Sequence, residues 1–302
     1  MPATRLRDDV AVIEDAPAKI NLALHVTGQR SDGYHLLDML VTFTRHGDRL
    51  EFRLAEEDEF AISGRFAEAL VDDRDDNLVL KARDILRDTI TREGGFAPAV
   101  RIHLQKNLPI ASGIGGGSAD AAATLRGLMR LWNVSLSNAT IEAIAVRIGA
   151  DVPMCLASRP LIARGIGEEI TPVDDMPAFA MLLANPLKGV STPEVFRKLA
   201  IKTNPPLDMT PRSTWVETIG SMRNDLEPVA RDLLPEITEI LAMLKKQGAS
   251  LVRMSGSGAT CYGIFDTLAA AEDAVAALHS ERPDWYFEAT ETIAGGHDAK
   301  TG

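Results

Sequence analysis

Alternating hydrophobic and polar positions predict a strand near the N-terminus. Within residues 18–26 the branched aliphatic side chains stand at every second position from 20 to 26. A period of two is typical of a half-buried strand, with one face on the core and the other in solvent. Lys19, Asn21 and His25 then share the second, polar face.

The same reasoning predicts the other elements. Strands are expected over 36–43, 50–54, 100–104, 161–165 and 285–290, helices over 77–91, 118–131, 138–148 and 267–279, and a hairpin over 251–265. Asn77 is placed to cap the first helix. Gly149 is suited to a left-handed residue at the end of the third helix. Strands and helices follow one another without βαβ regularity, which predicts an α+β fold.

The length of 302 residues favours two domains, at about 100–200 residues each. Beyond residue 165 the connections become rich in proline, which is typical of irregular linking segments. We therefore expect an N-terminal domain over 1–165 and a C-terminal domain over 166–302.

Composition and charge narrow the possible partners. The chain carries 32 Lys and Arg against 43 Asp and Glu, a net charge of −11. That excess of negative charge disfavours nucleic acid or an anionic membrane as a main partner. The longest apolar stretch, near 178–187, is too short for a bilayer, and the first 15 residues hold no secretory core. Cys155 and Cys261 suggest neither a disulfide framework nor a zinc site, so we expect a cytoplasmic protein.

A glycine-rich segment, 109–118, is the clearest candidate for chemistry. Its sequence PIASGIGGGS lies between a predicted strand and an alanine-rich helix. Glycines expose backbone N–H groups, and the following helix N-terminus attracts anions, so the segment suits a nucleotide phosphate. Ser118 is suited to capping the helix, to donating to phosphate or to binding magnesium. A flexible turn is the alternative reading.

The common nucleotide motifs are absent. No Gly-Lys-Ser/Thr exists in the chain, and Gly113-x-Gly115-x-x-Ser118 lacks the last glycine of the dinucleotide fingerprint. The HRD and DFG motifs of protein kinases are also missing. Position 120 is Asp, so Ser118 is not in a G-x-S-x-G nucleophile motif.

Three segments in order resemble the GHMP kinases, the superfamily of galactokinase, homoserine kinase and mevalonate kinase. They are APAKINL at 16–22, PIASGIGGGSADAA at 109–122 and MSGSGAT at 254–260. The resemblance implies a two-domain fold, with an N-terminal domain like ribosomal protein S5 domain 2 and a ferredoxin-like C-terminal domain.

Further segments sharpen the resemblance. RSDGYHLL at 30–37, GADVP at 149–153 and NDLE at 224–227 are most similar to members that act on 4-diphosphocytidyl-2-C-methyl-D-erythritol. This implies ATP-dependent phosphorylation of the 2-hydroxyl of that small molecule, in the non-mevalonate route to isoprenoid precursors. Magnesium is implied by the phosphate chemistry, and its ligands stay open.

The resemblance assigns an ATP site and two catalytic residues. The ATP-binding residues would be Pro109, Ile110, Ala111, Ser112, Gly113, Ile114, Gly115, Gly116, Gly117 and Ser118. Asp151 would be the catalytic aspartate and Lys19 a cation beside the attacking oxygen, holding Asp151 ionised. Asp151 is otherwise a helix cap, and Lys19 a lysine reaching solvent from a strand edge.

The substrate would meet aromatic and small residues. By resemblance Tyr34 stacks on cytosine, His35 hydrogen-bonds it and Phe196 closes the other ring face, with core packing as the alternative for each. Asn21 would bond substrate or lysine. The turn containing Gly256 and Ser257 would approach the substrate phosphate or the glycine loop, and a tight hairpin is compatible with that.

Other questions stay open at this level. Asn77 could flank the nucleotide or only cap a helix, and Lys106 could do the same or be a solvated loop charge. We expect a monomer or weak dimer. Competing functions are a GHMP kinase for another small alcohol, which would give Tyr34 and His35 no base to contact, and a non-catalytic nucleotide- or RNA-binding protein of S5-like fold. The net charge disfavours RNA, and the presence of both Lys19 and Asp151 disfavours a loss of catalysis.

Overall fold

The computed structural model describes residues 11–70, 77–110 and 112–296. These residues form two compact units. Of the described residues, unit 1 comprises 11–17, 47–70, 77–110 and 116–156, and unit 2 comprises 18–46, 112–115 and 157–296. Two long strands, β1 (Val12–Gln29) and β2 (His35–Leu54), contribute to both units.

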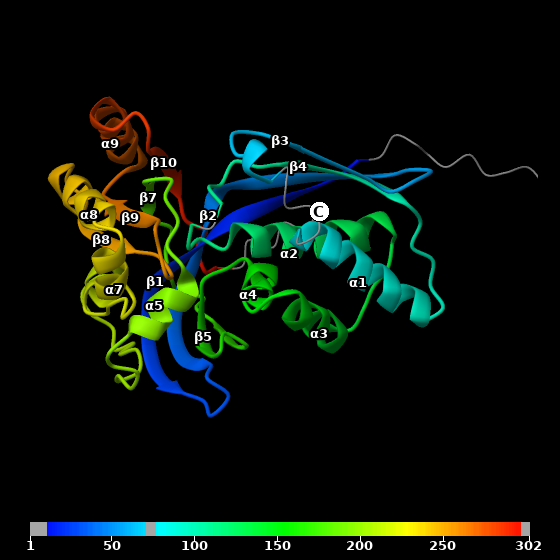
Figure 1. Cartoon of the computed structure of the whole chain (residues 1–302), viewed down its shortest axis with the longest axis horizontal. Coiled ribbons are helices and arrows are strands. Elements are labelled where there is room, and N and C mark those ends of the chain that lie inside the picture. The colour runs from blue at the N-terminus through cyan, green and yellow to red at the C-terminus, as the bar shows by residue number, and fades with distance from the viewer. Residues whose placement is uncertain (1–10, 71–76, 111, 297–302) are drawn as a thin grey trace, which may run out of the picture. The chain divides into compact units, whose positions relative to one another are not determined.

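Unit 1 combines a small sheet with four helices. The end of β2 pairs antiparallel with β4 (Val100–Gln105), and β3 (Glu59–Ser63) pairs parallel with β4. The helices are α1 (Leu78–Arg92), α2 (Gly116–Leu131), α3 (Asn138–Ile148) and α4 (Val152–Ala157), with a 3-10 turn at Glu68–Leu70. Helix α1 packs on α2 and α3 (Figure 1). A Cβ at Gly127 would lie 2.3 Å from the Phe52 ring, so the glycine lets α2 approach β2 closely.

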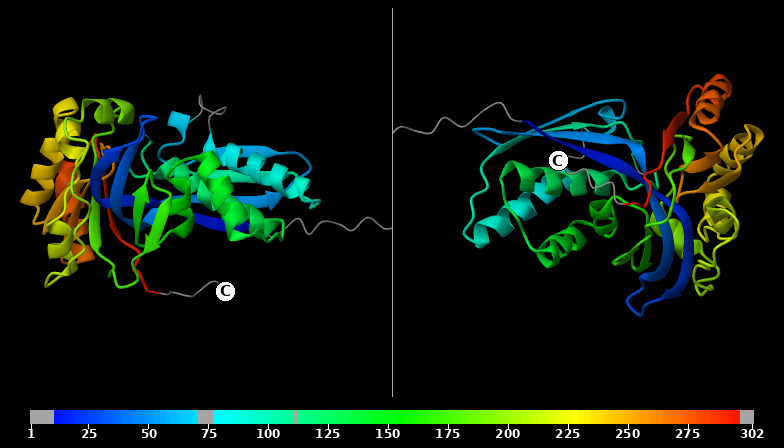
Figure 2. Two further views of the ribbon diagram at one scale, coloured as in Figure 1. Left: turned by 90° about the horizontal axis from the view of Figure 1, so that it is seen from below. Right: turned by 180° about the vertical axis from the view of Figure 1, so that it is seen from behind.

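Unit 2 contains a four-stranded antiparallel sheet in the order β10-β7-β9-β8. Its strands are β7 (Ala180–Asn185), β8 (Leu251–Met254), β9 (Cys261–Phe265) and β10 (Tyr286–Glu291). Helices α8 (Glu236–Lys246) and α9 (Leu268–Glu281) pack on this sheet (Figures 1 and 2). The start of β2 pairs with β5 (Leu161–Gly165), which pairs with β6 (Glu169–Pro172). The short helices are α5 (Thr192–Lys198), α6 (Trp215–Gly220) and α7 (Glu227–Leu233).

The predicted α+β class is confirmed, but β2 is a single strand where two were expected. Residues 36–43 and 50–54 belong to one strand because the polar stretch between them stays extended. A Cβ at Gly47 would lie 2.3 Å from the Ala16 carbonyl oxygen, so the glycine allows close passage. The exposed edge strand β3 was not predicted.

Residues 16–26 of strand β1 are buried on both faces, so the half-buried prediction was wrong. Lys19 and His25 are 4% and 3% exposed. The second face is covered by distant segments of unit 2. His25 Nδ1 donates to the Pro205 carbonyl at 3.0 Å, and the Tyr262 hydroxyl donates to the Leu22 carbonyl at 2.9 Å. Tertiary packing therefore buries the polar face of the strand. The alternation of residue types along the strand does not indicate such packing.

Two helix ends test the capping rules. Asn77 Oδ1 accepts the Val79 N–H at 2.9 Å, which confirms the predicted cap of α1. Gly149, at φ −179° and ψ 155°, is extended, so the predicted left-handed end of α3 was wrong. The chain leaves α3 directly toward α4 instead. Within the described ranges, no helix has both the length and the apolar character needed to cross a bilayer.

Candidate active site

The glycine-rich loop is held in unit 2 by the turn between β8 and β9. Ser255 Oγ donates to the Gly113 carbonyl at 3.1 Å. Gly113 has φ +75°, and a Cβ there would lie 2.6 Å from the Gly258 carbonyl oxygen. Gly256 approaches the loop in the same way, since its Cβ would lie 2.8 Å from the Gly113 oxygen. The two glycine segments therefore fit together only because both lack side chains.

Strand β1 joins the same cluster. The Lys19 N–H donates to the Ile114 carbonyl at 2.9 Å, and a Cβ at Gly115 would lie 3.2 Å from the Lys19 Cβ. The Asn21 N–H donates to Ser255 Oγ at 3.0 Å. The structure thus brings parts of the three sequence motifs together within unit 2.

Asn21 presents an unsatisfied acceptor at this cluster. Its side chain is buried, Nδ2 contacts Met39 Sδ at 3.3 Å, and Oδ1 has no hydrogen-bond partner. A buried polar atom without a partner costs free energy, which a ligand hydroxyl or amine can recover. The expected contact of Asn21 with the substrate stays a prediction.

Asn224 stabilises the turn between β8 and β9 through hydrogen bonds to its backbone, a role that sequence analysis missed. Its Nδ2 donates to the carbonyls of Met254 and Gly256, both at 2.8 Å. Glu227 Oε2 accepts the Met254 N–H at 3.0 Å. In the sequence analysis, residues 224–227 contributed only to the family resemblance. Hydrogen bonds from a side chain to backbone carbonyls leave no pattern in a sequence.

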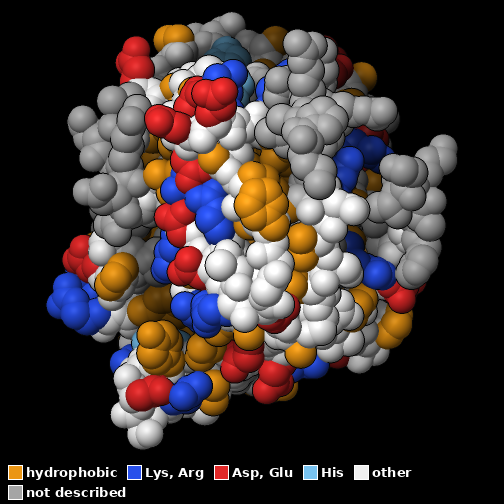
Figure 3. Space-filling view, turned by 90° about the vertical axis from the view of Figure 1, so that its right-hand side faces the viewer, with side chains coloured by type: hydrophobic (Ala, Val, Ile, Leu, Met, Phe, Trp, Pro, Cys, Tyr) orange, Lys and Arg blue, Asp and Glu red, His pale blue; other side chains and the backbone are white. Residues whose placement is uncertain are grey.

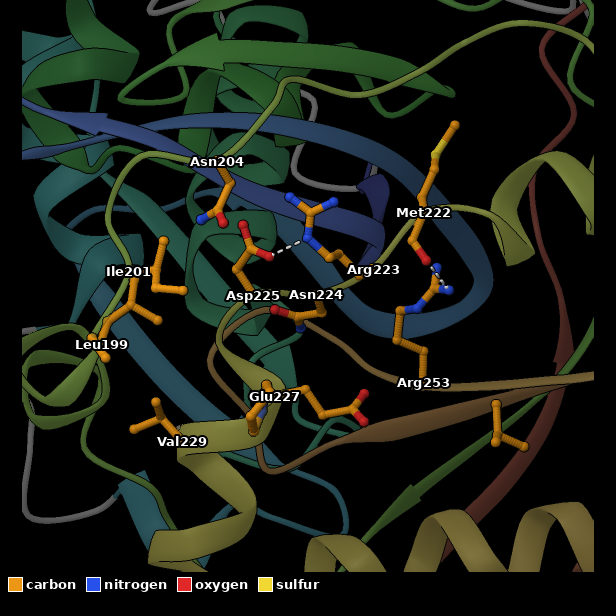
Figure 4. Close-up of a pocket in the computed structure, with 13 residues that line it drawn as sticks. Leu199, Ile201, Asn204, Met222, Arg223, Asn224, Asp225, Glu227, Val229 and Arg253 are labelled. Atoms are coloured by element: carbon orange, nitrogen blue, oxygen red, sulfur yellow. Dashed lines mark hydrogen bonds and ion pairs between the residues drawn. The ribbon is translucent and has the colours of Figure 1, made fainter.

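A cavity of about 530 Å³ lies next to these hydrogen bonds and is lined partly by Asn224 and Glu227 (Figure 4). Its charged groups are already engaged. Arg223 Nε donates to Asp225 at 2.6 Å, and the buried Arg253 guanidinium donates to three backbone carbonyls. None of the sequence-predicted site residues lines the cavity.

The predicted base-binding residues differ in their surroundings: Tyr34 is exposed, whereas His35 and Phe196 stack on each other. Tyr34 is 61% exposed, which excludes the core-packing alternative for its ring. His35 stacks on Phe196, with ring centroids 4.8 Å apart and planes 25° from parallel. Partial burial, and then the charge of Lys202, lower the pKa of His35 below its usual 6.5, which favours the neutral imidazole. His35 Nε2 has no hydrogen-bond partner.

Ser257 and Gly256 lie in the β8–β9 turn. Ser257 Oγ is 2.6 Å from Thr192 Oγ1, at the start of α5. Gly256 has φ +57°, a conformation that favours glycine. The expected close approach of this turn to the glycine loop is confirmed. Its contact with substrate stays a prediction.

Asp151 lies in unit 1 immediately before α4. Its carbonyl accepts the Cys155 N–H at 3.1 Å, so it begins a new helical turn as predicted. Its side chain is partly exposed. Lys19 belongs to unit 2, and the expected pairing of these two residues stays a prediction.

The end of the glycine-rich segment forms the first turn of α2. The helix begins at Gly116, two residues before the expected start, so Gly116, Gly117 and Ser118 supply N-terminal N–H groups. Pro109 is buried and Ile110 exposed. Ala111 lies outside the described residues.

Lys106 is a buried ion-pair partner, so its reading as a solvated charge was wrong. The side chain is 3% exposed, with Nζ 2.5 Å from Asp48 Oδ2 and 2.7 Å from Asp120 Oδ2. The two carboxylates raise the pKa of Lys106 despite its burial. Burial raises the pKa of Asp120 to about 8. Sequence analysis missed both aspartates, although Asp120 within an alanine-rich helix was a signal of a buried charge.

The donor groups also bear on magnesium. Among the described residues, no three His, Cys, Asp or Glu side chains gather closely enough to hold a metal ion. Proteins usually bind Mg²⁺ through one or two oxygen ligands together with nucleotide phosphates and water. Ser118, in the first turn of α2, offers such an oxygen, and this donor set fits an ion carried by ATP.

Comparison with known proteins identifies the family. The family "GHMP kinases N terminal domain" matches residues 77–159, and "GHMP kinases C terminal" matches residues 213–284. A curated relative from Rhizobium etli is 66% identical over 98% of this chain and all of its own length. The chain belongs to the GHMP kinases.

Relatives indicate where in the GHMP kinases the chain lies. The Rhizobium etli protein is named 4-diphosphocytidyl-2-C-methyl-D-erythritol kinase. A protein of the same name from Agrobacterium fabrum is 59% identical over 93% of this chain and 96% of its own. The sequence similarity to both proteins extends through the residues that match the N- and C-terminal GHMP kinase families.

Solved structures agree with this GHMP kinase assignment. A crystal structure of 4-(cytidine 5'-diphospho)-2C-methyl-D-erythritol kinase matches with a TM-score of 0.78 and 30% identity, over 94% of this chain and all of that one. Homoserine kinase from Cytophaga hutchinsonii matches with a TM-score of 0.64 and 17% identity, over 97% of each chain. The second likeness shows a shared fold alone.

Proposed function

We propose that this GHMP kinase transfers the γ-phosphate of ATP to the 2-hydroxyl of 4-diphosphocytidyl-2-C-methyl-D-erythritol, in the methylerythritol phosphate route to isoprenoid precursors. The observation that carries this conclusion is the identity of 52–66% to eight proteins of that name, over at least 92% of the chain. Family membership makes the chain an ATP-dependent small-molecule kinase.

ATP is proposed to bind along residues 109–118. The helix N-terminus at Gly116 supplies N–H donors and a favourable dipole for the phosphates. The positive φ of Gly113 and Gly115 is a backbone conformation that favours glycine, and it supports a loop whose N–H groups are not shielded by side chains at these two positions. Magnesium would travel with ATP and neutralise phosphate charge, with Ser118 as the proposed protein ligand.

Asp151 and Lys19 are the proposed catalytic residues. Asp151 would accept the proton of the attacking hydroxyl, and Lys19 would place positive charge near the transferring phosphate. Lys19 is fixed by its backbone bond to Ile114 of the loop, which supports a role close to the nucleotide. The partly exposed carboxylate of Asp151 supports its access to a small molecule.

Cytidine recognition is assigned to Tyr34, His35 and Phe196. An exposed tyrosine ring and a histidine–phenylalanine stack offer the flat apolar faces on which a base stacks. His35 Nε2 lacks a partner and suits a hydrogen bond to the base edge. Asn21 Oδ1, Gly256 and Ser257 are proposed to meet the rest of the substrate.

Several further features are proposals on the same basis. We place the domain division at residue 165, between the two matched family regions. The protein would be cytoplasmic and a monomer or weak dimer, without nucleic acid as a partner. Figure 3 supports the last point, since acidic and basic side chains intermingle on the described part of that face.

The deciding experiment measures ADP release from magnesium-ATP with four acceptors: the cytidyl diphospho-methylerythritol, homoserine, galactose and mevalonate. Turnover should occur with the cytidyl compound and stay near background with the others. Turnover of another acceptor, with none for the cytidyl compound, would replace the proposed substrate while leaving the kinase assignment intact.

A further inference from the structure

Unit 1 contains a buried trio of charged side chains that the proposed reaction does not use. Lys106 lies between Asp48 and Asp120, and all three side chains are at most 4% exposed. Asp48 comes from β2, Lys106 follows β4 directly, and Asp120 is the fifth residue of α2. Burying three charges costs free energy, and apolar residues often stabilise a core equally well.

The trio contacts both ends of the glycine-rich segment. Asp48 Oδ1 accepts the N–H groups of Asn107 and Leu108 at 2.6 and 2.9 Å, immediately before Pro109. At the other end, Lys106 Nζ would lie 3.2 Å from a Cβ on Gly116, the first residue of α2. The ammonium therefore lies against the helix turn whose N–H groups would receive phosphate.

We propose that Asp120 is a positioning residue for ATP, which acts through Lys106 to hold the first turn of α2 in its phosphate-binding position. This inference rests on the proposed binding of ATP at the glycine-rich segment. Asp120 is itself part of α2, and its bond to Lys106 ties that helix to the end of β4 and, through Asp48, to β2. Removing the tie frees the helix start relative to the strands.

Asp120 has one carboxylate oxygen bonded to Lys106 and one without a partner. Its Oδ2 accepts from Lys106 Nζ at 2.7 Å, whereas among the described residues its buried Oδ1 has no hydrogen-bond partner. A buried polar atom without a partner costs free energy. The bond to Lys106 is therefore a contact on which the position of the Asp120 side chain depends.

Three variants test the proposal through KM values. Lys106→Met removes the central ammonium, and we expect the KM for ATP to rise about tenfold or more while the KM for the alcohol changes less than twofold. Asp120→Ala should raise the KM for ATP in the same direction. Asp120→Asn keeps the size of the side chain and an oxygen that can accept from Lys106 Nζ, so its KM for ATP should rise less than that of Asp120→Ala.

The comparison of the two KM values separates positioning from mere stability. A loss of ATP positioning raises the KM for ATP and leaves the KM for the alcohol unchanged, and Asp120→Asn should restore most of the ATP affinity that Asp120→Ala loses. Glu59→Gln, which disrupts the exposed Glu59–Arg101 pair on neighbouring strands, is the control and should keep the normal KM for ATP. A normal KM for ATP in Asp120→Ala would overturn the proposal, even if Lys106→Met failed to fold.

Gly116→Val distinguishes a failure of the positioning role from a failure of the proposed ATP site. This side chain would occupy the space between the helix start and Lys106 Nζ. If Gly116→Val raises the KM for ATP and the Lys106 and Asp120 variants do not, the positioning role fails and the ATP site stands. If a folded Gly116→Val also leaves the KM for ATP unchanged, the proposed ATP site itself is wrong.

Discussion

The imidazole of His35 stacks directly on the phenyl ring of Phe196, at 4.8 Å between centroids. A flat base held between two rings needs about 7 Å between them, because each stacked contact takes roughly 3.5 Å. Cytosine therefore has no room between His35 and Phe196 as they lie. The outer faces of this pair and the exposed ring of Tyr34 are the surfaces left for a base.

Tyr34→Ala should raise the KM for the cytidyl substrate by roughly 10–100-fold, since base stacking on an aromatic ring contributes about 1–3 kcal/mol. The KM for ATP should change little, and because Tyr34 is exposed the fold should survive. Steady-state kinetics with each substrate varied checks this. Tyr34→Phe is the matched control and should keep most of the affinity. Equal weakening of ATP and the cytidyl substrate would remove the stacking role.

Lys202→Met should raise the pKa of His35 toward 6.5, because the Lys202 charge contributes to lowering it. The rise should be partial, since burial is the larger cause and is unchanged. Titration of the imidazole by NMR measures it directly, with Lys245→Met as a control at an exposed lysine of α8. An unchanged or lowered pKa in Lys202→Met would contradict the electrostatic explanation.

Asp151→Asn should lower kcat by about 10²–10⁴-fold, the usual contribution of a general base, and leave the KM for ATP nearly unchanged. The amide keeps the size of the carboxylate but does not accept a proton. Asp232→Asn, at an exposed position of α7, should retain normal kcat. Near-normal turnover in Asp151→Asn would show that Asp151 serves only the local helix turn.

Gly113→Ala should destabilise the protein more than Gly94→Ala. The two glycines have similar φ values, +75° and +79°, so the backbone strain is alike, about 1–2 kcal/mol. Only Gly113 meets carbonyl oxygens, at 2.6 and 2.7 Å from the added Cβ, whereas Gly94 has nothing within 4 Å. Urea unfolding gives the two free energies, and Gly113→Ala should also raise the KM for ATP. Equal losses in the free energy of unfolding would mean that the β8–β9 turn shifts to accommodate the added Cβ at little cost.

Asp120→Asn should be more stable than the unmodified protein at pH 8, with the difference shrinking toward pH 4. The raised pKa of about 8 means that folded Asp120 keeps its proton where the unfolded chain has lost it. Stability from this group is therefore complete near pH 4 and falls as the pH rises to about 8. Thermal unfolding should show Tm differences that grow over this range by on the order of 5 °C. A constant difference would place the pKa of Asp120 near its ordinary value.

Local rules predicted much of the framework from sequence. Period-two alternation identified β1 and β4, and the Asn77 cap marked the start of α1. These features depend on neighbours within a few residues, so the sequence carries them directly. The glycine-rich segment was also identified from sequence, since four glycines around a helix start have few structural uses other than close backbone approach. Exact ends were less accurate, as the continuous β2 and the extended Gly149 show.

By itself, the sequence determined the α+β class, the family motifs and the residue types available for phosphate and base binding. Only the tertiary structure decided which of them meet. It showed that Ser255 bonds the carbonyl of Gly113, that Asn224 supports the turn, and that Lys106 is buried between two aspartates. The physical reason is that burial and hydrogen bonding join residues far apart in the chain, 142 positions for Ser255 and Gly113 and 240 for Tyr262 and Leu22. Such partners are set by the packing of whole elements rather than by local pattern.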